Sequence, residues 1–261
     1  MRSLLAILLF AAACAPRSET PPAFDLANYT LVDLTHSFNA QTIYWPTSTR
    51  TFEHPQQSFG KTPGGWFYSS YELSTPEHGG THLDAPVHFA EGRHAAEAVP
   101  LEQLIAPAVV VDVSAKAATD PVYRLTRADV EAWEKHNGRI EPGTIVLLRT
   151  GWGKRWPDRK AYFGGEAAES KLRFPSYGVD AAQLLLERRI AALGVDTASI
   201  DHGPSTDFAV HVLVNGADVP AFENVANIDA LPERGAIVIA LPMKVAGGSG
   251  GPLRIVALVP R

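Results

Sequence analysis

The residues with the clearest chemical potential lie in one short stretch, Glu77-His78-Gly79-Gly80-Thr81-His82-Leu83-Asp84-Ala85-Pro86-Val87-His88. Its metal-competent side chains, at positions 78, 82, 84 and 88, all share one parity. In an extended chain residues two apart share a face, so His82 and Asp84 point the same way if this stretch is a strand. Imidazoles and a carboxylate together suit Zn²⁺, Mn²⁺ or Fe²⁺. The spacing therefore predicts a metal site.

The residues around this pair can bend the backbone toward it. Gly79-Gly80 disfavours a helix and lets the chain turn, so that His78 converges on His82 and Asp84. Pro86 ends the extended run and can turn His88 back toward the same space. The alternatives are ordinary surface or core histidines, or a purely structural metal. Structural zinc sites are usually rich in cysteine, and this chain has only one, so the pattern favours an open site.

Composition excludes several other classes of protein. The chain has 261 residues, 46% of them hydrophobic and 20% charged, which is typical of one globular domain. Its net charge of −5 shows no excess of basic residues that could bind phosphates, so we expect no nucleic-acid partner. A single cysteine, Cys14, excludes internal disulfides and paired-thiolate zinc sites.

The first residues are typical of an export signal. Arg2 precedes an apolar run at 4–13, which is too short to span a membrane, and Cys14 follows directly. This resembles the lipobox of bacterial lipoproteins, although the usual leucine three residues before the cysteine is Ala11 here. The alternative is a secreted protein with simple A-x-A cleavage. We expect a signal at 1–14, a flexible tether at 15–27 and one domain at 28–261, in a periplasmic or membrane-anchored protein.

Strand and helix patterns alternate only in part, which favours a mixed α/β domain. Helices are predicted after the capping box Thr126–Asp129, with a stop at Asn137-Gly138, and over 180–193. The aromatic segment 151–177 is either a covering loop or an insertion with a small core of its own. Apolar or β-branched runs predict strands at 31–35, 67–74, 108–113, 144–149, 194–200, 236–241 and 253–258.

The histidine stretch matches the pattern His-x-Gly-Thr-His-x-Asp-x-Pro-x-His at every fixed position, and so resembles the putative cyclase family. That family includes bacterial kynurenine formamidases and isatin hydrolases. The likeness covers most of 31–258, including Val32-Asp33-Leu34-Thr35-His36 and Gly194-Val195-Asp196-Thr197. It implies a mixed β/β/α fold with a barrel-like sheet and outer helices, and a homodimer.

The resemblance also assigns the site residues. It implies that His78, His82 and Asp84 bind a metal, that His211 and Glu223 complete a second position or the outer coordination, and that His88 is the general acid/base. The cofactor is then one or two divalent ions, Zn²⁺ or Mn²⁺. By itself, His211 among apolar neighbours could equally be a buried, hydrogen-bonded histidine. His36 and His202 are expected to support the ligands.

The expected activity is hydrolysis of an aromatic amide. A bound divalent ion can lower the pKa of a water to ~7 and polarise a carbonyl, while His88 takes a proton and returns it to the leaving nitrogen. An arylformamidase is the leading interpretation, with an isatin hydrolase-like lactamase as the alternative. A non-catalytic envelope protein that carries a metal or ligand is the second alternative.

Two further features bear on this activity. Trp45 is the candidate substrate-binding residue, in a candidate aromatic wall that includes Trp66, Phe67, Tyr68 and Phe89; for most of these residues ordinary core packing is the favoured alternative. The stretch Gly247-Gly248-Ser249-Gly250-Gly251 formally matches a serine-nucleophile motif, but no Asp or His follows it. Because the other members of a catalytic triad do not follow the serine in the chain, the motif does not indicate a serine hydrolase.

Overall fold

The computed structural model describes residues 24–165 and 171–261. The expected signal at 1–14 and most of the expected tether at 15–27 lie outside the described residues. At the end of that tether, Leu26–Asn28 forms a 3₁₀ turn, η1, which Asp25 caps by accepting a hydrogen bond from the backbone N–H of Ala27. No helix within the described ranges is long and apolar enough to cross a membrane.

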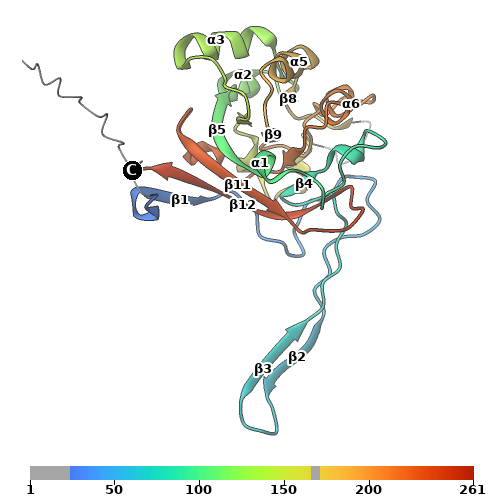
Figure 1. Cartoon of the computed structure of the whole chain (residues 1–261). Helices are drawn as coiled ribbons and strands as arrows, with labels where there is room; N and C mark the ends of the chain where they lie inside the picture. The colour runs from blue at the N-terminus through green and yellow to red at the C-terminus, as the bar shows by residue number, and fades with distance from the viewer. Residues whose placement is uncertain (1–23, 166–170) are drawn as a thin grey trace, which may run out of the picture.

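The central sheet closes into a barrel, as expected (Figure 1). The strands follow the order β12-β11-β5-β7-β9-β10-β4, and β4 pairs back onto β12; β1 (Tyr29–Asp33) extends the sheet beside β12. Pairing is parallel along β5, β7, β9 and β10 and antiparallel elsewhere. The barrel strands are β4 (His82–Asp84), β5 (Ile105–Asp112), β7 (Ile145–Arg149), β9 (Ala192–Val195), β10 (Ala221–Glu223), β11 (Ala236–Pro242) and β12 (Gly250–Pro260).

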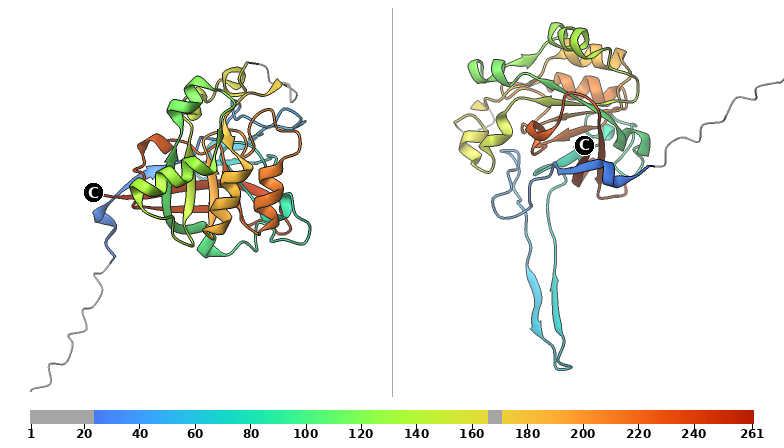
Figure 2. Two further views of the ribbon diagram at one scale, coloured as in Figure 1. Left: turned by 90° about the horizontal axis from the view of Figure 1, so that it is seen from above. Right: turned by 90° about the vertical axis from the view of Figure 1, so that its left-hand side faces the viewer.

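Helices connect the parallel strands and cover one side of the barrel. Figure 2 shows α3 (Arg127–Asn137), α5 (Val179–Glu187) and α6 (Ala209–Gly216) side by side, with α5 in contact with both neighbours. The predicted capping box is confirmed: Thr126 accepts from the N–H of Asp129, and Gly138 with φ 81° follows the helix. Short helices complete the connections: α1 (Leu101–Leu104), α2 (Ser114–Thr119), η2 (Pro86–His88) and η5 (Ile228–Ala230).

The prediction of one helix over 180–193 is wrong at its end. Helix α5 ends at Glu187, Arg189 takes a left-handed φ of 57°, and strand β9 begins at Ala192. The apolar residues after the turn are buried in a parallel strand, where both faces are covered. A short apolar run does not by itself distinguish such a strand from a continued helix.

Alternation along the strands produces two hydrophobic cores. Ala108 and Ile145 belong to one core, which Leu83 and Phe222 share, whereas their chain neighbours Val109 and Val146 belong to the other. The second core also contains the buried faces of α3, α5 and α6. Because successive strand residues face opposite sides, the first core fills the barrel and the second joins it to the helices.

The described part of segment 151–177 has no core entirely of its own. Its Trp152, Tyr162 and Phe174 share a third core with Ile43 and Ala198, and Phe163 lines a cavity. Asp158 caps the short helix in this segment through the N–H of Ala161. Its elements are η3 (Trp152–Arg155), α4 (Arg159–Tyr162) and β8 (Ser176–Tyr177), the last paired with β6 (Arg124–Leu125).

A two-stranded arm projects far from the body of the molecule (Figures 1 and 2). It consists of β2 (Gln56–Lys61) and β3 (Phe67–Tyr71), paired only with each other. Trp66, Phe67 and Tyr68 lie on it and are more than half exposed, at 64%, 59% and 51%. The expectation that these three residues line an aromatic wall is therefore wrong, because the arm carries them away from the barrel.

Candidate metal centre

The strand β4 places the first ligands. His82 and Asp84 share one face, while Leu83 between them points into the barrel core. The antiparallel register sets Glu223 of β10 directly opposite His82. Since opposed residues of a sheet face the same side, the Glu223 carboxylate lies beside the His82 ring, with Oε2 3.6 Å from Nε2.

His78 reaches the same point from the loop before β4. Gly79 and Gly80 both have positive φ, 146° and 60°, and a Cβ on Gly79 would lie 2.1 Å from the Tyr44 ring. The bend brings His78 Nδ1 to 2.6 Å from Asp84 Oδ1. The predicted convergence of the two histidines on Asp84 is therefore present in the structure.

His211 arrives from a different part of the fold. It lies in the first turn of α6, and its Nε2 is 3.3 Å from Asp84 Oδ2 and 3.1 Å from Glu223 Oε1. Its Nδ1 donates to the buried carboxylate of Asp201 at 2.7 Å. Asp201 also accepts from the backbone N–H groups of Val210 and His211, so it fixes both the helix start and the ring.

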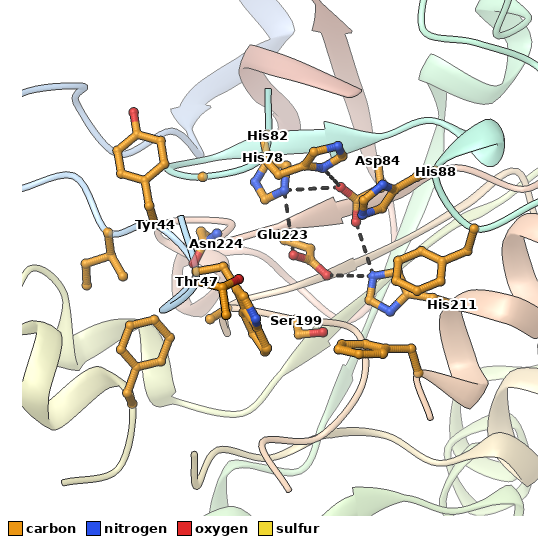
Figure 3. Close-up of a pocket in the computed structure, with 17 residues that line it drawn as sticks. Tyr44, Thr47, His78, His82, Asp84, His88, Ser199, His211, Glu223 and Asn224 are labelled. Atoms are coloured by element: carbon orange, nitrogen blue, oxygen red, sulfur yellow. Dashed lines mark hydrogen bonds and ion pairs between the residues drawn. The ribbon is translucent and has the colours of Figure 1, made fainter. Parts of the chain in front are cut away.

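Together these side chains form two candidate ligand groups that share Asp84 (Figure 3). One comprises His78, His82 and Asp84, and the other Asp84, His211 and Glu223, with the ligand atoms of each group within 4.8 Å of one another. Imidazole nitrogens and carboxylate oxygens are ligands that Zn²⁺ and Mn²⁺ accept. The donor set therefore fits a divalent metal.

The charges at this centre favour a cation. Burial alone would lower the pKa of His82, but Asp84 and Glu223 outweigh it and raise that pKa to about 9. Burial opposes the ionised form of Asp84 as well, yet His82 and His78 hold its pKa well below the usual range. Burial and the neighbouring Asp84 charge raise the pKa of Glu223. Burial would also lower the pKa of His211, but the Asp201, Asp84 and Glu223 carboxylates raise it. Without a cation His82 and His211 therefore hold protons that balance the carboxylates, and a divalent ion can replace those protons.

His88 lies beside the centre without belonging to either ligand group. It ends the 3₁₀ turn η2, which begins at Pro86, and its ring stacks on His78 with 3.8 Å between centroids. Among the described residues no side chain hydrogen-bonds to this ring. Burial lowers the pKa of His88 to about 4, so the ring is neutral at pH 7. A neutral, unbonded imidazole beside the ligands can exchange protons with a bound molecule.

The centre opens into a cavity of about 320 Å³. Trp45 and Phe89, both expected near the substrate, line it together with Phe163 and Phe208. The Trp45 ring meets Phe163 edge-on at 6.4 Å between centroids. Its role in substrate binding stays a prediction, as do the roles of the ligands and of His88.

The expected supporting histidines do not bond to the ligands. His36 stacks on Trp156 at 4.2 Å, and its Nε2 has no hydrogen-bond partner in the described part of the chain. His202 lines a separate surface depression with Tyr123 and Asp180.

Other residues hold the ligand histidines in place, and they were not predicted from the sequence. Asp201 holds His211, and the carbonyl of Gly80 accepts from His82 Nδ1 at 3.0 Å. Asn224, with a left-handed φ of 53°, donates to the same carbonyl at 2.8 Å. Asp201 stands in a stretch that resembles the family, but nothing in its local sequence indicates that it faces a helix start.

Comparisons with known proteins agree with this geometry. The profile of the family described as Putative cyclase matches residues 32–202. The isatin hydrolase of Roseibium aggregatum is 35% identical over 205 residues, which cover 76% of this chain and 77% of that protein. The kynurenine formamidase of Salinibacter ruber is 27% identical over 241 residues, covering 87% and 96%.

Solved structures of isatin hydrolases have the same fold as this chain. An isatin hydrolase bound to the product analogue thioisatinate superposes with a TM-score of 0.83 at 31% identity, covering 90% of this chain and 94% of the other. Isatin hydrolase A from Ralstonia solanacearum superposes with a TM-score of 0.81 at 32% identity, covering 89% and 93%. The barrel and its outer helices are thus shared with these enzymes.

Proposed function

The chain belongs to the putative cyclase family and is a metal-dependent hydrolase, and from that premise we propose that it cleaves the carbon–nitrogen bond of aromatic amides. The observation that carries the proposal is that the ring of His88 lies beside the two candidate ligand groups that share Asp84 and belongs to neither of them. A protein that only carries metal has no need of a free acid/base beside the ion.

The cofactor is one or two divalent ions, Zn²⁺ or Mn²⁺, held by the residues of the two ligand groups. When bound, such an ion lowers the pKa of water and stabilises negative charge on a carbonyl oxygen. His88 takes a proton from the water that adds to the carbonyl carbon and returns it to the nitrogen as the carbon–nitrogen bond breaks, since an arylamine is a poor leaving group as an anion. The aromatic walls, including Trp45, hold the ring of the substrate and exclude water.

The cavity favours uncharged substrates within this class. Among the described residues that line it there is no lysine or arginine. Arg159 contacts two lining residues, donating to the Tyr44 carbonyl and stacking over Phe163, but does not itself line the cavity. The described lining thus offers no cationic side chain to the carboxylate of N-formylkynurenine, which favours a neutral arylformamide or a lactam such as isatin. This observation keeps lactam hydrolysis as the second candidate beside the arylformamidase.

The test combines metal analysis with a substrate panel. Purified protein is analysed for metal, stripped with a chelator, reconstituted with Zn²⁺ or Mn²⁺, and assayed on formylanilide, N-formylkynurenine and isatin. We expect activity to disappear on chelation and to return with metal, highest on formylanilide or isatin. Tightly bound metal with no hydrolysis of any aryl amide would instead identify a carrier. The exposed His136, at the end of α3, provides a control variant, His136→Ala, which should change neither metal content nor activity.

We also propose a homodimer joined through the arm. A two-stranded hairpin alone is marginally stable in water, and exposed apolar patches usually mark interfaces. Phe59 and Trp66 are 62% and 64% exposed, and β2 and β3 each have a free edge. A two-fold contact would place the same patch of both copies together. Replacing both aromatic residues by serine should halve the mass measured by light scattering, whereas a dimer that persists would place the interface elsewhere.

Export to the periplasm, with or without a lipid on Cys14, is likewise proposed. It rests on Arg2, the apolar run at 4–13 and the position of the single cysteine. Labelling with a radioactive fatty acid tests the lipid: Cys14→Ser should abolish the label if the lipobox interpretation holds. A secreted protein without label would support simple signal cleavage.

A further inference from the structure

The candidate ligand histidines share one arrangement. Each has one ring nitrogen directed at the carboxylates and the other held by a different group. His82 donates its Nδ1–H to the Gly80 carbonyl, and His211 donates its Nδ1–H to Asp201. Such outer partners fix the tautomer and the orientation of a metal-binding imidazole. For His78, the group that holds the second ring nitrogen has still to be identified.

The far nitrogen of His78 meets Ser249. His78 Nε2 lies 2.8 Å from Ser249 Oγ. A hydroxyl can donate or accept, so by itself it does not fix the tautomer of the ring. Glu77 resolves this, because its Oε2 accepts both the Ser249 hydroxyl proton at 2.7 Å and the Ser249 backbone N–H at 2.9 Å. The lone pair of Oγ is then left to accept the Nε2–H of His78, and Nδ1 faces Asp84.

We propose that Ser249 and Glu77 are positioning residues that hold His78 in the orientation and tautomer needed to bind metal. This inference rests on the proposed function, since it assigns a role toward the same ion. It also gives a use to the glycine-rich stretch 247–251, which the family resemblance and the mechanism leave without one.

The surrounding backbone is shaped for this contact. A Cβ on Gly250 would lie 2.3 Å from the Leu83 carbonyl oxygen and 2.7 Å from Cε1 of His78, so glycine is needed for the close approach of the backbone and the ring. The Ser249 carbonyl accepts from the N–H of Ala85 at 2.8 Å, next to Asp84. On the other side, Gly247 donates its N–H to Glu97. Ser249 is thus held against the ligand strand from both directions, and its hydroxyl has little freedom to turn elsewhere.

A rival interpretation is a serine nucleophile. Ser249 Oγ, His78 and Asp84 have the order of contacts found in a Ser-His-Asp triad, at 2.8 and 2.6 Å. Two observations oppose it. The Ser249 hydroxyl proton points to Glu77, not to the imidazole, and Ser249 is not among the residues that line the cavity. The two interpretations differ in what removal of the hydroxyl does to metal binding.

The experiment measures Zn²⁺ affinity by chelator competition, and the visible spectrum with Co²⁺, for wild type, Ser249→Ala, Ser249→Thr and Glu77→Gln. Loss of an outer partner typically weakens metal binding by about 10- to 100-fold. We expect a loss of that size in Ser249→Ala, recovery in Ser249→Thr, which keeps a hydroxyl, and an intermediate loss in Glu77→Gln. At saturating metal the kcat of Ser249→Ala should approach that of wild type. Thr119→Val, which removes a hydroxyl bonded to the Lys116 carbonyl at the end of α2, is the control.

Several results would overturn the inference. Unchanged affinity in Ser249→Ala and Glu77→Gln would show that the pair only braces the loop. Unchanged affinity with activity lost even at saturating metal would indicate the nucleophile instead. If Ser249→Ala does not fold, the volume-conserving Glu77→Gln decides the question alone. Failure of the wild type to bind metal at all would refute the proposed function, which is a separate outcome.

Discussion

Replacement of His88 by alanine tests the proposed chemistry most directly. Burial lowers the pKa of His88 to about 4, so the ring is neutral at pH 7 and can accept a proton. Positioned acid–base catalysis is typically worth about 10² to 10⁴ in rate, or about 3–5 kcal/mol of barrier. We therefore expect His88→Ala to lower kcat by about that factor on formylanilide or isatin.

Metal binding should survive the same change. His88 belongs to neither ligand group, and His78, on which it stacks, keeps its contacts with Asp84 and Ser249. The assay follows substrate absorbance at saturating metal, with metal content measured on the same samples and His136→Ala as the matched histidine control. Added imidazole, which can enter the space left by the ring, should restore part of the rate.

Two outcomes would refute this reasoning. Wild-type turnover in His88→Ala would remove the acid/base role altogether. A loss of bound metal in proportion to the loss of activity would mean that His88 acts as a ligand, and that its separation from the two groups does not describe the working enzyme.

Three further predictions follow from particular contacts. Asp84→Asn should lose metal from both positions and Glu223→Gln from one at most, as measured by elemental analysis per chain; equal losses would contradict the shared role of Asp84. His36 has its pKa lowered to about 4 by burial, so its contribution to stability is intact above pH 6.5 and falls as the pH drops toward 4. In metal-free protein, the wild type should lose about 2 kcal/mol more unfolding free energy than His36→Phe between pH 6.5 and pH 4, after allowance for the partly exposed ring. Urea titrations at the two pH values measure this difference. Tyr177 donates its buried hydroxyl to the carbonyls of Val146 and Gly194, so Tyr177→Phe should cost about 1–2 kcal/mol of unfolding free energy; unchanged stability would show that these carbonyls need no donor.

Local patterns predicted the elements whose signals are complete in the sequence. The capping box at Thr126 and the glycine at 138 defined α3, because both ends of a helix depend on nearby residues. The boundary between α5 and β9 was not predictable in this way. The chain there is apolar throughout, and the left-handed turn at Arg189 is required by packing of the following strand into the sheet, not by its own side chain.

The arm formed by β2 and β3 shows a second limit of prediction from local sequence. Its aromatic residues have the composition of a buried strand, and a strand was predicted over 67–74, of which 67–71 forms β3. Whether such a strand joins the main sheet or stands apart depends on partners distant in the chain. The sequence therefore indicated a β-strand rich in aromatic residues, whereas the tertiary structure placed it outside the barrel.

The sequence by itself determined the half of the site that is local. Strand alternation and the glycines at 79 and 80 sufficed to predict that His78, His82 and Asp84 converge, because a few backbone angles control that convergence. The remainder depended on the fold. His211 and Glu223 reach Asp84 only because α6 packs against η2, which follows β4, and because β10 pairs with β4. Ser249 likewise meets the ring of His78 across 171 residues of chain. Contacts of that kind are set by the closure of the barrel, which no spacing of residues along the chain encodes.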